Sequence, residues 1–268
     1  MKKTYFFLTF MLMFLLPINS IGQLKGTSRN HLISWTQSVD GTLTFVGSGI
    51  LDGREFSGFS DDFKVCNRRI VISSGITEVR YLHDMCQVEH VSLPNTLKKI
   101  GTFAFRGYSE LKSITIPASV IEIAQCAFDM REWGGGKLER IIVDKNNAQF
   151  KSINGILYDH DVKTLICCPS GYNGEVNIPN TVETIEEMAF SFCNNLRNVK
   201  LPEKLTIIKD SAFMYSNIRS LNIPQSVSYI GKDVFNGCRE LKRVYVGNKN
   251  LNINNVIPKN IISVNPIK

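Results

Sequence analysis

Two neighbouring stretches carry the residues best suited to chemistry, Asp159-His160-Asp161 and Cys167-Cys168. The first would place two carboxylates beside an imidazole, a donor set that can bind a divalent metal. The second would supply a thiol for His160 to activate as a nucleophile. The first stretch also has the composition of a solvated turn, and adjacent strand residues face opposite sides, so one thiol of the pair would lie in the core. We therefore expect no catalytic residue, no metal site and no cofactor here.

Other motifs are incomplete. Gly47-Ser48-Gly49 lacks the Gly-Lys-Ser/Thr that completes a phosphate-binding loop, and His83-Asp84-Met85-Cys86 lacks zinc-ligand spacing and a second cluster. The sequence contains no Gly-x-Ser-x-Gly and no His-Glu-x-x-His. These observations favour a protein that is not an enzyme.

Charge and length set further limits. The chain has 268 residues and a formal net charge of +7. Its densest basic cluster is Arg68-Arg69, which falls short of a nucleic-acid-binding patch. We expect no nucleic-acid partner.

The N-terminus has the organisation of a secretory signal peptide. Lys2-Lys3 precede an apolar run from Tyr5 to Leu16, Pro17 breaks it, and Ser20-Ile21-Gly22 offers a small-residue cleavage site. We expect residues 1–22 to be removed on export and the mature chain to lack a membrane span. The expected location is secreted or cell surface, with the periplasm as the alternative.

Seven cysteines are present, an odd number. Cys66 and Cys86 are candidates for a disulfide, and this pairing stays open. Cys193 and Cys238 occupy the same position two repeats apart, roughly 10 Å from each other if strands stack at about 4.8 Å, so we expect buried free thiols there.

A recurring phrase organises most of the chain. It consists of a Leu/Ile-Pro pair, two spaced aliphatic residues and an Ala-Phe pair, the last copy having Val234-Phe235 instead. The copies start at Leu93-Pro94, Ile116-Pro117, Ile178-Pro179, Leu201-Pro202 and Ile223-Pro224. Within runs of consecutive copies the prolines are 22 or 23 residues apart, a period typical of a solenoid.

Each repeat predicts one short strand that the proline ends, as in Leu111–Pro117. We expect the Ala-Phe pair to lie in a short helical or 3₁₀ turn, with Phe in the core. The predicted fold class is α+β, mostly β: a solenoid with repeats of about 23 residues and short strands on one face.

Four regions follow from this pattern. Residues 1–22 are the signal peptide and 23–68 an N-terminal β cap, with Asp40-Gly41 as a hairpin turn between Ile33–Trp35 and Leu43–Phe45. Residues 69–250 form the solenoid, and about 144–174 carry an inserted β-hairpin that turns at Asn154-Gly155. Residues 251–268 form a C-terminal cap or tail.

These motifs resemble the BspA-like leucine-rich repeat family of bacterial surface and secreted proteins. The repeat phrase, the interrupting segment from Phe150 to Pro169, and Asp40–Thr44 with Gly47-Ser48-Gly49 carry the resemblance. It covers nearly all of the mature chain. The resemblance implies a leucine-rich repeat solenoid and extracellular interaction, often adhesion to host, matrix or bacterial partners.

The best site candidate is the outer face of the predicted strands, whose residues alternate with core positions. They are His90, Ser92, Ser113, Thr115, Arg140, Ile142, Asn198, Lys200, Ser220, Asn222, Arg243 and Tyr245. Stacked strands would turn them into one ladder of hydroxyl, amide and cationic groups that suits a protein or glycan, with Arg140, Arg243 and Tyr245 as first hot-spot candidates. The simpler interpretation is a solvated sheet face.

The leading hypothesis is a non-enzymatic exported repeat protein that binds an extracellular protein or glycan through this face, as an adhesin would. The alternative is a periplasmic or envelope scaffold with no specific ligand.

Overall fold

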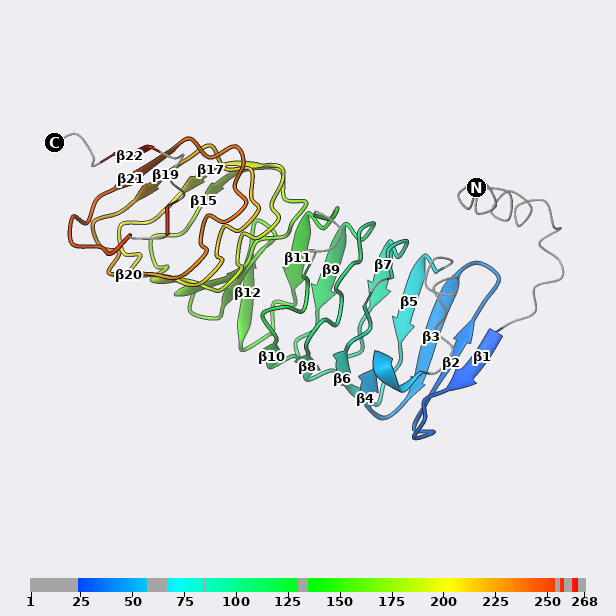
Figure 1. Cartoon of the computed structure of the whole chain (residues 1–268). Helices are drawn as coiled ribbons and strands as arrows, with labels where there is room; N and C mark the ends of the chain where they lie inside the picture. Colours follow the sequence, from blue (N-terminus) through cyan, green and yellow to red (C-terminus); the bar gives the residue numbers. More distant parts are fainter. Residues whose placement is uncertain are drawn as a thin grey trace, which may run out of the picture.

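The computed structural model describes residues 24–56, 67–83, 85–129, 135–253, 256–257 and 262–264. The expected signal peptide and much of the expected C-terminal cap lie outside these residues. Nearly every described element is a strand, and the one described helix is a 3₁₀ turn at Gly53–Glu55 (η2). The chain winds as a solenoid from β1 to β22 (Figure 1).

An antiparallel unit begins the fold. Strand β1 (Leu24–Thr27) pairs with β2 (Ile33–Gln37), and β2 with β3 (Thr42–Gly47). Gly41 makes the β2–β3 turn with a φ of 78°, and Asp40 accepts hydrogen bonds from Ser38 and Thr42. Phe45 of β3 is fully buried, and β3 then pairs in parallel with β5 (Arg69–Ile72). The sequence prediction of an N-terminal β unit with this turn is confirmed.

The solenoid has two rows of parallel strands, which we call the major and minor strands. The major strands after β3 are β5 (Arg69–Ile72), β7 (His90–Ser92), β9 (Ser113–Ile116), β11 (Arg140–Val143), β15 (Gly174–Asn177), β17 (Leu196–Lys200), β19 (Ser220–Ile223), β21 (Arg243–Val246) and β22 (Ile262–Val264). The minor strands are β4 (Gly49–Asp52), β6 (Ile76–Arg80), β8 (Lys99–Ile100), β10 (Glu122–Ile123), β14 (Thr164–Cys167), β16 (Thr184–Ile185), β18 (Ile207–Ile208) and β20 (Tyr229–Ile230). Figure 1 shows β4, β6, β8 and β10 along one edge of the N-terminal half, below the major strands.

The repeat phrase accounts for both rows. In β9, Ile114 and Ile116 are buried, and Pro117 follows because proline cannot donate a ladder hydrogen bond. The second aliphatic residue of the phrase, such as Ile100 or Ile208, is the buried residue of a minor strand. The mostly-β solenoid predicted from the sequence is confirmed, and the structure adds the minor row.

The Ala-Phe pair does not form the helical turn that the sequence suggested. The residue before the pair has positive φ, as in Met188 at 58° and Ser211 at 56°, which a 3₁₀ helix does not allow. The backbone N–H of Phe190 instead donates to the carbonyl of Ala212 in the next turn, at 2.7 Å. Backbone hydrogen bonds between successive turns of the solenoid are thus present here, in place of the hydrogen bonds expected within a helical turn.

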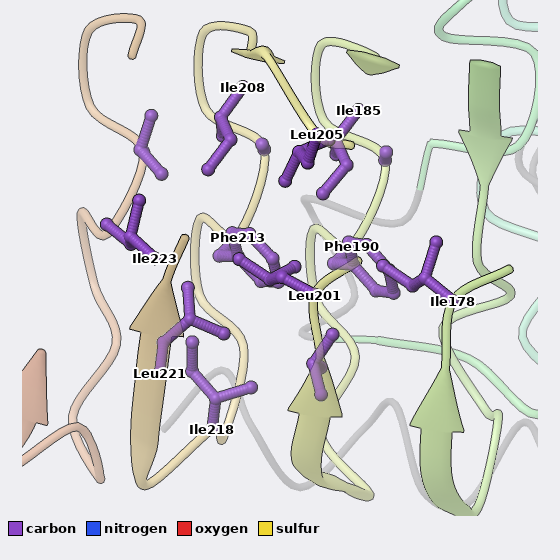
Figure 2. Close-up of a cluster of buried hydrophobic side chains, with 14 of the residues drawn as sticks. Ile178, Ile185, Phe190, Leu201, Leu205, Ile208, Phe213, Ile218, Leu221 and Ile223 are labelled. Carbon is purple, nitrogen blue, oxygen red and sulfur yellow. The ribbon is translucent and has the colours of Figure 1, made fainter. Parts of the chain in front are cut away.

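The phenylalanines stack along the axis in the C-terminal half. Phe190 and Phe213 have ring centroids 4.8 Å apart, and Phe213 and Phe235 lie 6.0 Å apart. All three are fully buried. Figure 2 shows Phe190 and Phe213 at the centre of a layered aliphatic core that includes Leu201, Ile208 and Leu221.

An inserted hairpin interrupts the stack, as predicted. Strands β12 (Phe150–Ile153) and β13 (Ile156–Asp159) are antiparallel, and Asn154 and Gly155 both have positive φ, 52° and 84°, the geometry of a type I′ turn. Strand β13 is buried on both sides. Leu157 belongs to the N-terminal core cluster, whereas Ile156 and Tyr158 belong to the C-terminal cluster.

Six cysteines lie in the described residues, all as free thiols. Cys193 and Cys238 are buried, as expected from their shared repeat position. Cys86 is free, and its candidate partner Cys66 lies outside the described residues. Within the described part of the chain, no helix has the length and hydrophobicity needed to cross a membrane.

Candidate binding surface

The residues predicted for the sheet face lie on the major strands, four and two residues before the repeat proline. After β11 and β21 the position of this proline is taken by Asp144 and Gly247. In β19, Ser220 and Asn222 are half-buried and exposed, while Leu221 and Ile223 are buried. The other predicted positions are likewise exposed or half-buried, and the strand residue between each pair is buried except for Val91, which is half-buried.

The face is not the single ladder that the sequence suggested. Strands β9 and β11 form one two-stranded sheet, β15 and β17 another, and β19, β21 and β22 a third. The hairpin β12–β13 comes between β11 and β15, and in Figure 1 the major strands beyond it are seen at a different angle. The hairpin therefore separates the predicted residues into two patches, each of which spans one break between sheets.

The N-terminal patch lies on β7, β9 and β11 and consists of His90, Ser92, Ser113, Thr115, Arg140 and Ile142. Ser113 is in register with Arg140, and Thr115 with Ile142, which is 44% exposed. The Arg140 stem lies against Gly155, where a β-carbon would come within 2.8 Å of Arg140 Cγ. Arg140 thus also supports the hairpin turn.

The C-terminal patch lies on β17, β19 and β21 and consists of Asn198, Lys200, Ser220, Asn222, Arg243 and Tyr245. Ser220 is in register with Arg243, and Asn222 with Tyr245. Since Arg140 and Arg243 lie in different patches, they do not form one hot spot.

The C-terminal patch is hollowed. An open groove of about 330 Å³ is lined by Asn198, Lys200, Ser220 and Asn222, together with Val199, Leu201, Glu203, Ile223 and Pro224. It lies where β17 and β19 belong to separate sheets and their ladder is open. Four predicted residues are thereby brought around one concave site that has amide, hydroxyl, ammonium and carboxylate groups.

Further residues of this face were missed, including two on β15. Glu175 and Asn177 of β15 are exposed, in register with Asn198 and Lys200, and Asn198 Nδ2 donates to Glu175 Oε1 at 2.9 Å. These residues follow the predicted insertion of about 144–174 and were not included in the predicted face. The spacing from Pro179, four and two residues, was the signal that identifies them.

The residues considered for catalysis are not arranged for it. Asp159 Oδ1 accepts hydrogen bonds from the backbone N–H groups of Lys163 and Thr164, which closes a turn, and His160 is exposed. Burial raises the pKa of Cys167 to about 12 and that of Cys168 well above its ordinary value. Because the nucleophile is the thiolate, both thiols are poorly suited to attack at neutral pH.

Metal binding finds no support in the described ranges, where no three His, Cys, Asp or Glu side chains gather in a way that could hold an ion. A small enclosed space of about 20 Å³ beside Cys167 and Cys168 has room for about one water molecule. A ligand larger than a water molecule would therefore bind on the open surface and not in this space.

Comparison with known proteins agrees with this architecture. The model for the BspA type leucine rich repeat region matches in six copies, over residues 68–154 and 170–267. A search of curated proteins found no significant match.

Solved bacterial structures share the fold. A leucine-rich repeat protein from Eubacterium ventriosum is 21% identical with a TM-score of 0.55, over 84% of this chain and 73% of that one. A leucine rich cell surface protein from Faecalibacterium prausnitzii is 18% identical with a TM-score of 0.54, over 92% and 95%. A leucine-rich repeat protein from Bacteroides ovatus is 19% identical with a TM-score of 0.50, over 85% and 64%. The repeat phrase, the two strand rows and the family match together establish that this chain belongs to the BspA-type leucine-rich repeat family.

Proposed function

We propose that this chain is an exported, non-enzymatic binding protein that recognises an extracellular protein or glycan through the C-terminal patch of its major strands. The observation that carries the proposal is the groove between β17 and β19. It is concave, polar and built on strands whose inner side chains are fixed in the core. A rigid scaffold that presents hydrogen-bonding groups loses little conformational entropy when it binds.

Export rests on the first 22 residues, which have the charge, apolar run and cleavage site of a signal peptide. The fold shared with the Faecalibacterium prausnitzii cell surface protein is consistent with that placement. Adhesion is the function that follows for an exported repeat protein that binds surface molecules.

The test is binding of the purified chain to a panel of extracellular matrix proteins and glycans. A groove variant carries Asn198→Ala, Lys200→Ala and Asn222→Ala. A matched control carries Gln149→Ala, Lys232→Ala and Asn236→Ala, which also removes two exposed amides and one exposed lysine but away from the groove. Hot-spot residues typically cost 2 kcal/mol or more when truncated, so we expect the groove variant to bind its ligand roughly 30-fold more weakly.

The control variant should bind as the unmodified chain does. Equal binding by all three proteins would remove the groove from the account, and a folded chain that binds no member of the panel would favour the scaffold alternative.

A further inference from the structure

Another column of the same sheets carries an unusual set of charges. It consists of the exposed residues five positions before each repeat proline, or before Ser73, Asp144 and Gly247, which take its place. These residues lie at the N-terminal ends of the major strands. In chain order they are Arg68, Glu89, Lys112, Glu139, Gly174, Arg197, Arg219 and Lys242. We call these residues the edge column.

Backbone hydrogen bonds establish that the column is stacked. Glu89 N–H donates to the Arg68 carbonyl at 2.8 Å, which joins the first two turns. In the C-terminal half, Arg219 N–H donates to the Arg197 carbonyl at 3.4 Å and Lys242 N–H to the Arg219 carbonyl at 2.9 Å. Neighbouring members therefore lie one strand spacing apart, about 4.8 Å along the axis.

The two halves of the edge column differ in sign. In the N-terminal half the charge alternates, and Arg68 forms an ion pair with Glu89 at 3.7 Å. In the C-terminal half three cations stand in succession, and Arg197, Arg219 and Lys242 form no ion pair within the described residues. Like charges on facing strand positions repel, so this arrangement costs stability that alternation would avoid.

Two further cations border this run on the C-terminal patch. Lys200 lies at the groove, and Arg243 directly follows Lys242. Nearby carboxylates are those of Glu175, which accepts a hydrogen bond from Asn198, and of Glu203 and Glu240. Cations exceed anions in this region, so the edge attracts an anionic partner.

We propose that a linear polyanionic glycan, sulfated or carboxylated, binds along Arg197, Arg219 and Lys242. This inference rests on the proposed binding function and names the partner class for the C-terminal patch. An extended polyanion that lies along the solenoid axis would meet one cation at every turn. The amides and hydroxyl of Asn198, Ser220 and Asn222 lie beside this path and can hydrogen-bond the hydroxyl groups of sugars.

The spacing disfavours an acidic peptide as the partner. Side chains on one face of an extended peptide recur about 6.6–6.8 Å apart, which does not match cations that recur about every 4.8 Å. The hydroxyl groups of a glycan can both accept from the amide N–H and hydroxyl groups of the groove and donate to its amide oxygens, whereas an acidic side chain can only accept.

The experiment measures the affinity of the purified full chain at physiological ionic strength. The probes are a heparin fragment, a polygalacturonate fragment and a polyglutamate peptide of equal charge. The column variant carries Arg197→Gln, Arg219→Gln and Lys242→Gln. The charge-matched control carries Lys98→Gln, Lys151→Gln and Lys232→Gln, three exposed lysines outside the edge column.

We expect at least one glycan to bind more tightly than polyglutamate, and added salt to weaken that binding. The column variant should lose about a hundredfold in affinity, because each cation near an anionic surface contributes about fivefold. The control should lose less than about threefold. The column variant should also unfold at the same or a higher urea concentration than the unmodified chain, because it removes the repulsion between neighbouring cations. The single variant Arg219→Gln repeats the affinity measurement with only the central cation removed.

Three results would overturn the inference. Equal losses in the two triple variants would mean general attraction to a basic protein, and polyglutamate binding as tight as the glycans would favour an acidic protein partner. Absence of glycan binding would also reject it. In that last case, if a neutral glycan or a protein from the matrix panel binds and the groove variant abolishes its binding, the inference fails but the proposed function stands.

Discussion

Phe213 lies between two other aromatic rings in the C-terminal core. Its ring stacks between those of Phe190 and Phe235 and is fully buried. Phe213→Ala should therefore destabilise the chain by about 3–5 kcal/mol, since it removes a buried ring and leaves a cavity between two turns. Urea unfolding followed by circular dichroism measures the change.

Tyr229→Ala provides the matched control. Tyr229 lies on a minor strand nearby but is 52% exposed, so its removal should change the free energy of unfolding by about 0.5 kcal/mol or less. Similar effects of the two substitutions would contradict the proposed stacking of the core.

Asp52 is a buried carboxylate that two arginines hold ionised. Burial opposes its ionisation, but hydrogen bonds from Arg54 and Arg80 outweigh this and keep its pKa below the ordinary value. A depressed pKa in the folded chain stabilises it above the unfolded pKa of about 4, and this contribution is lost as the pH falls through the folded value.

Asp52→Asn should consequently lower the free energy of unfolding by about 1–3 kcal/mol at neutral pH. The difference from the unmodified chain should shrink as the pH drops below about 4. Urea titrations across this range measure it, with exposed Asp161→Asn as control. A difference that stays constant with pH would show that Asp52 contributes through packing and not through its charge.

At the scale of elements, Asn147 joins the inserted hairpin to the preceding turn. Its side chain is buried, Nδ2 donates to the carbonyls of Pro117 and Val120, and Oδ1 accepts from the N–H groups of Gln149 and Phe150. These four bonds use both N–H groups of the amide and both lone pairs of its oxygen.

Asn147→Ala should cost about 3 kcal/mol or more, since it leaves several backbone groups buried without partners. Asn147→Asp should also destabilise, because a carboxylate cannot donate to the two carbonyls. Hydrogen exchange should accelerate first in β12 and β13. Exposed Asn146→Ala is the control, and unchanged exchange in the hairpin would refute this role for Asn147.

Some elements could be predicted from the sequence because a local pattern determines them. The Leu/Ile-Pro pairs predicted the ends of the major strands, and Asn154-Gly155 predicted a hairpin turn. The minor strands have as few as two residues, too few for an alternating pattern. The helical turn at Ala-Phe was a wrong prediction because bonding to the next turn is a long-range interaction that the local sequence does not contain.

At the scale of the molecule, β13 divides the core. Ile156, Leu157 and Tyr158 are buried in succession, and they belong alternately to the C-terminal and N-terminal clusters. The sequence predicted which residues would lie on the outer face, but it predicted one continuous ladder. The division into two patches follows from a strand buried on both sides, and three consecutive large apolar residues were its only local signal.

This division predicts that the halves of the solenoid respond separately to damage. In a repeat protein each turn contacts mainly its neighbours, so a destabilising change spreads only a short distance. Phe213→Ala should accelerate hydrogen exchange in β16 to β20 while β2 to β9 keep their protection. Equal acceleration in both halves would mean that the core unfolds as one cooperative unit.

The central claim is that the C-terminal patch faces partners outside the cell, and antibody access to producing cells tests it most directly. An antibody raised against the folded chain is too large to enter an intact envelope. Intact cells, permeabilised cells and culture medium are compared. We predict labelling of intact cells or recovery of the chain in the medium. Labelling that appears only after permeabilisation would contradict the claim and place the chain among envelope scaffolds.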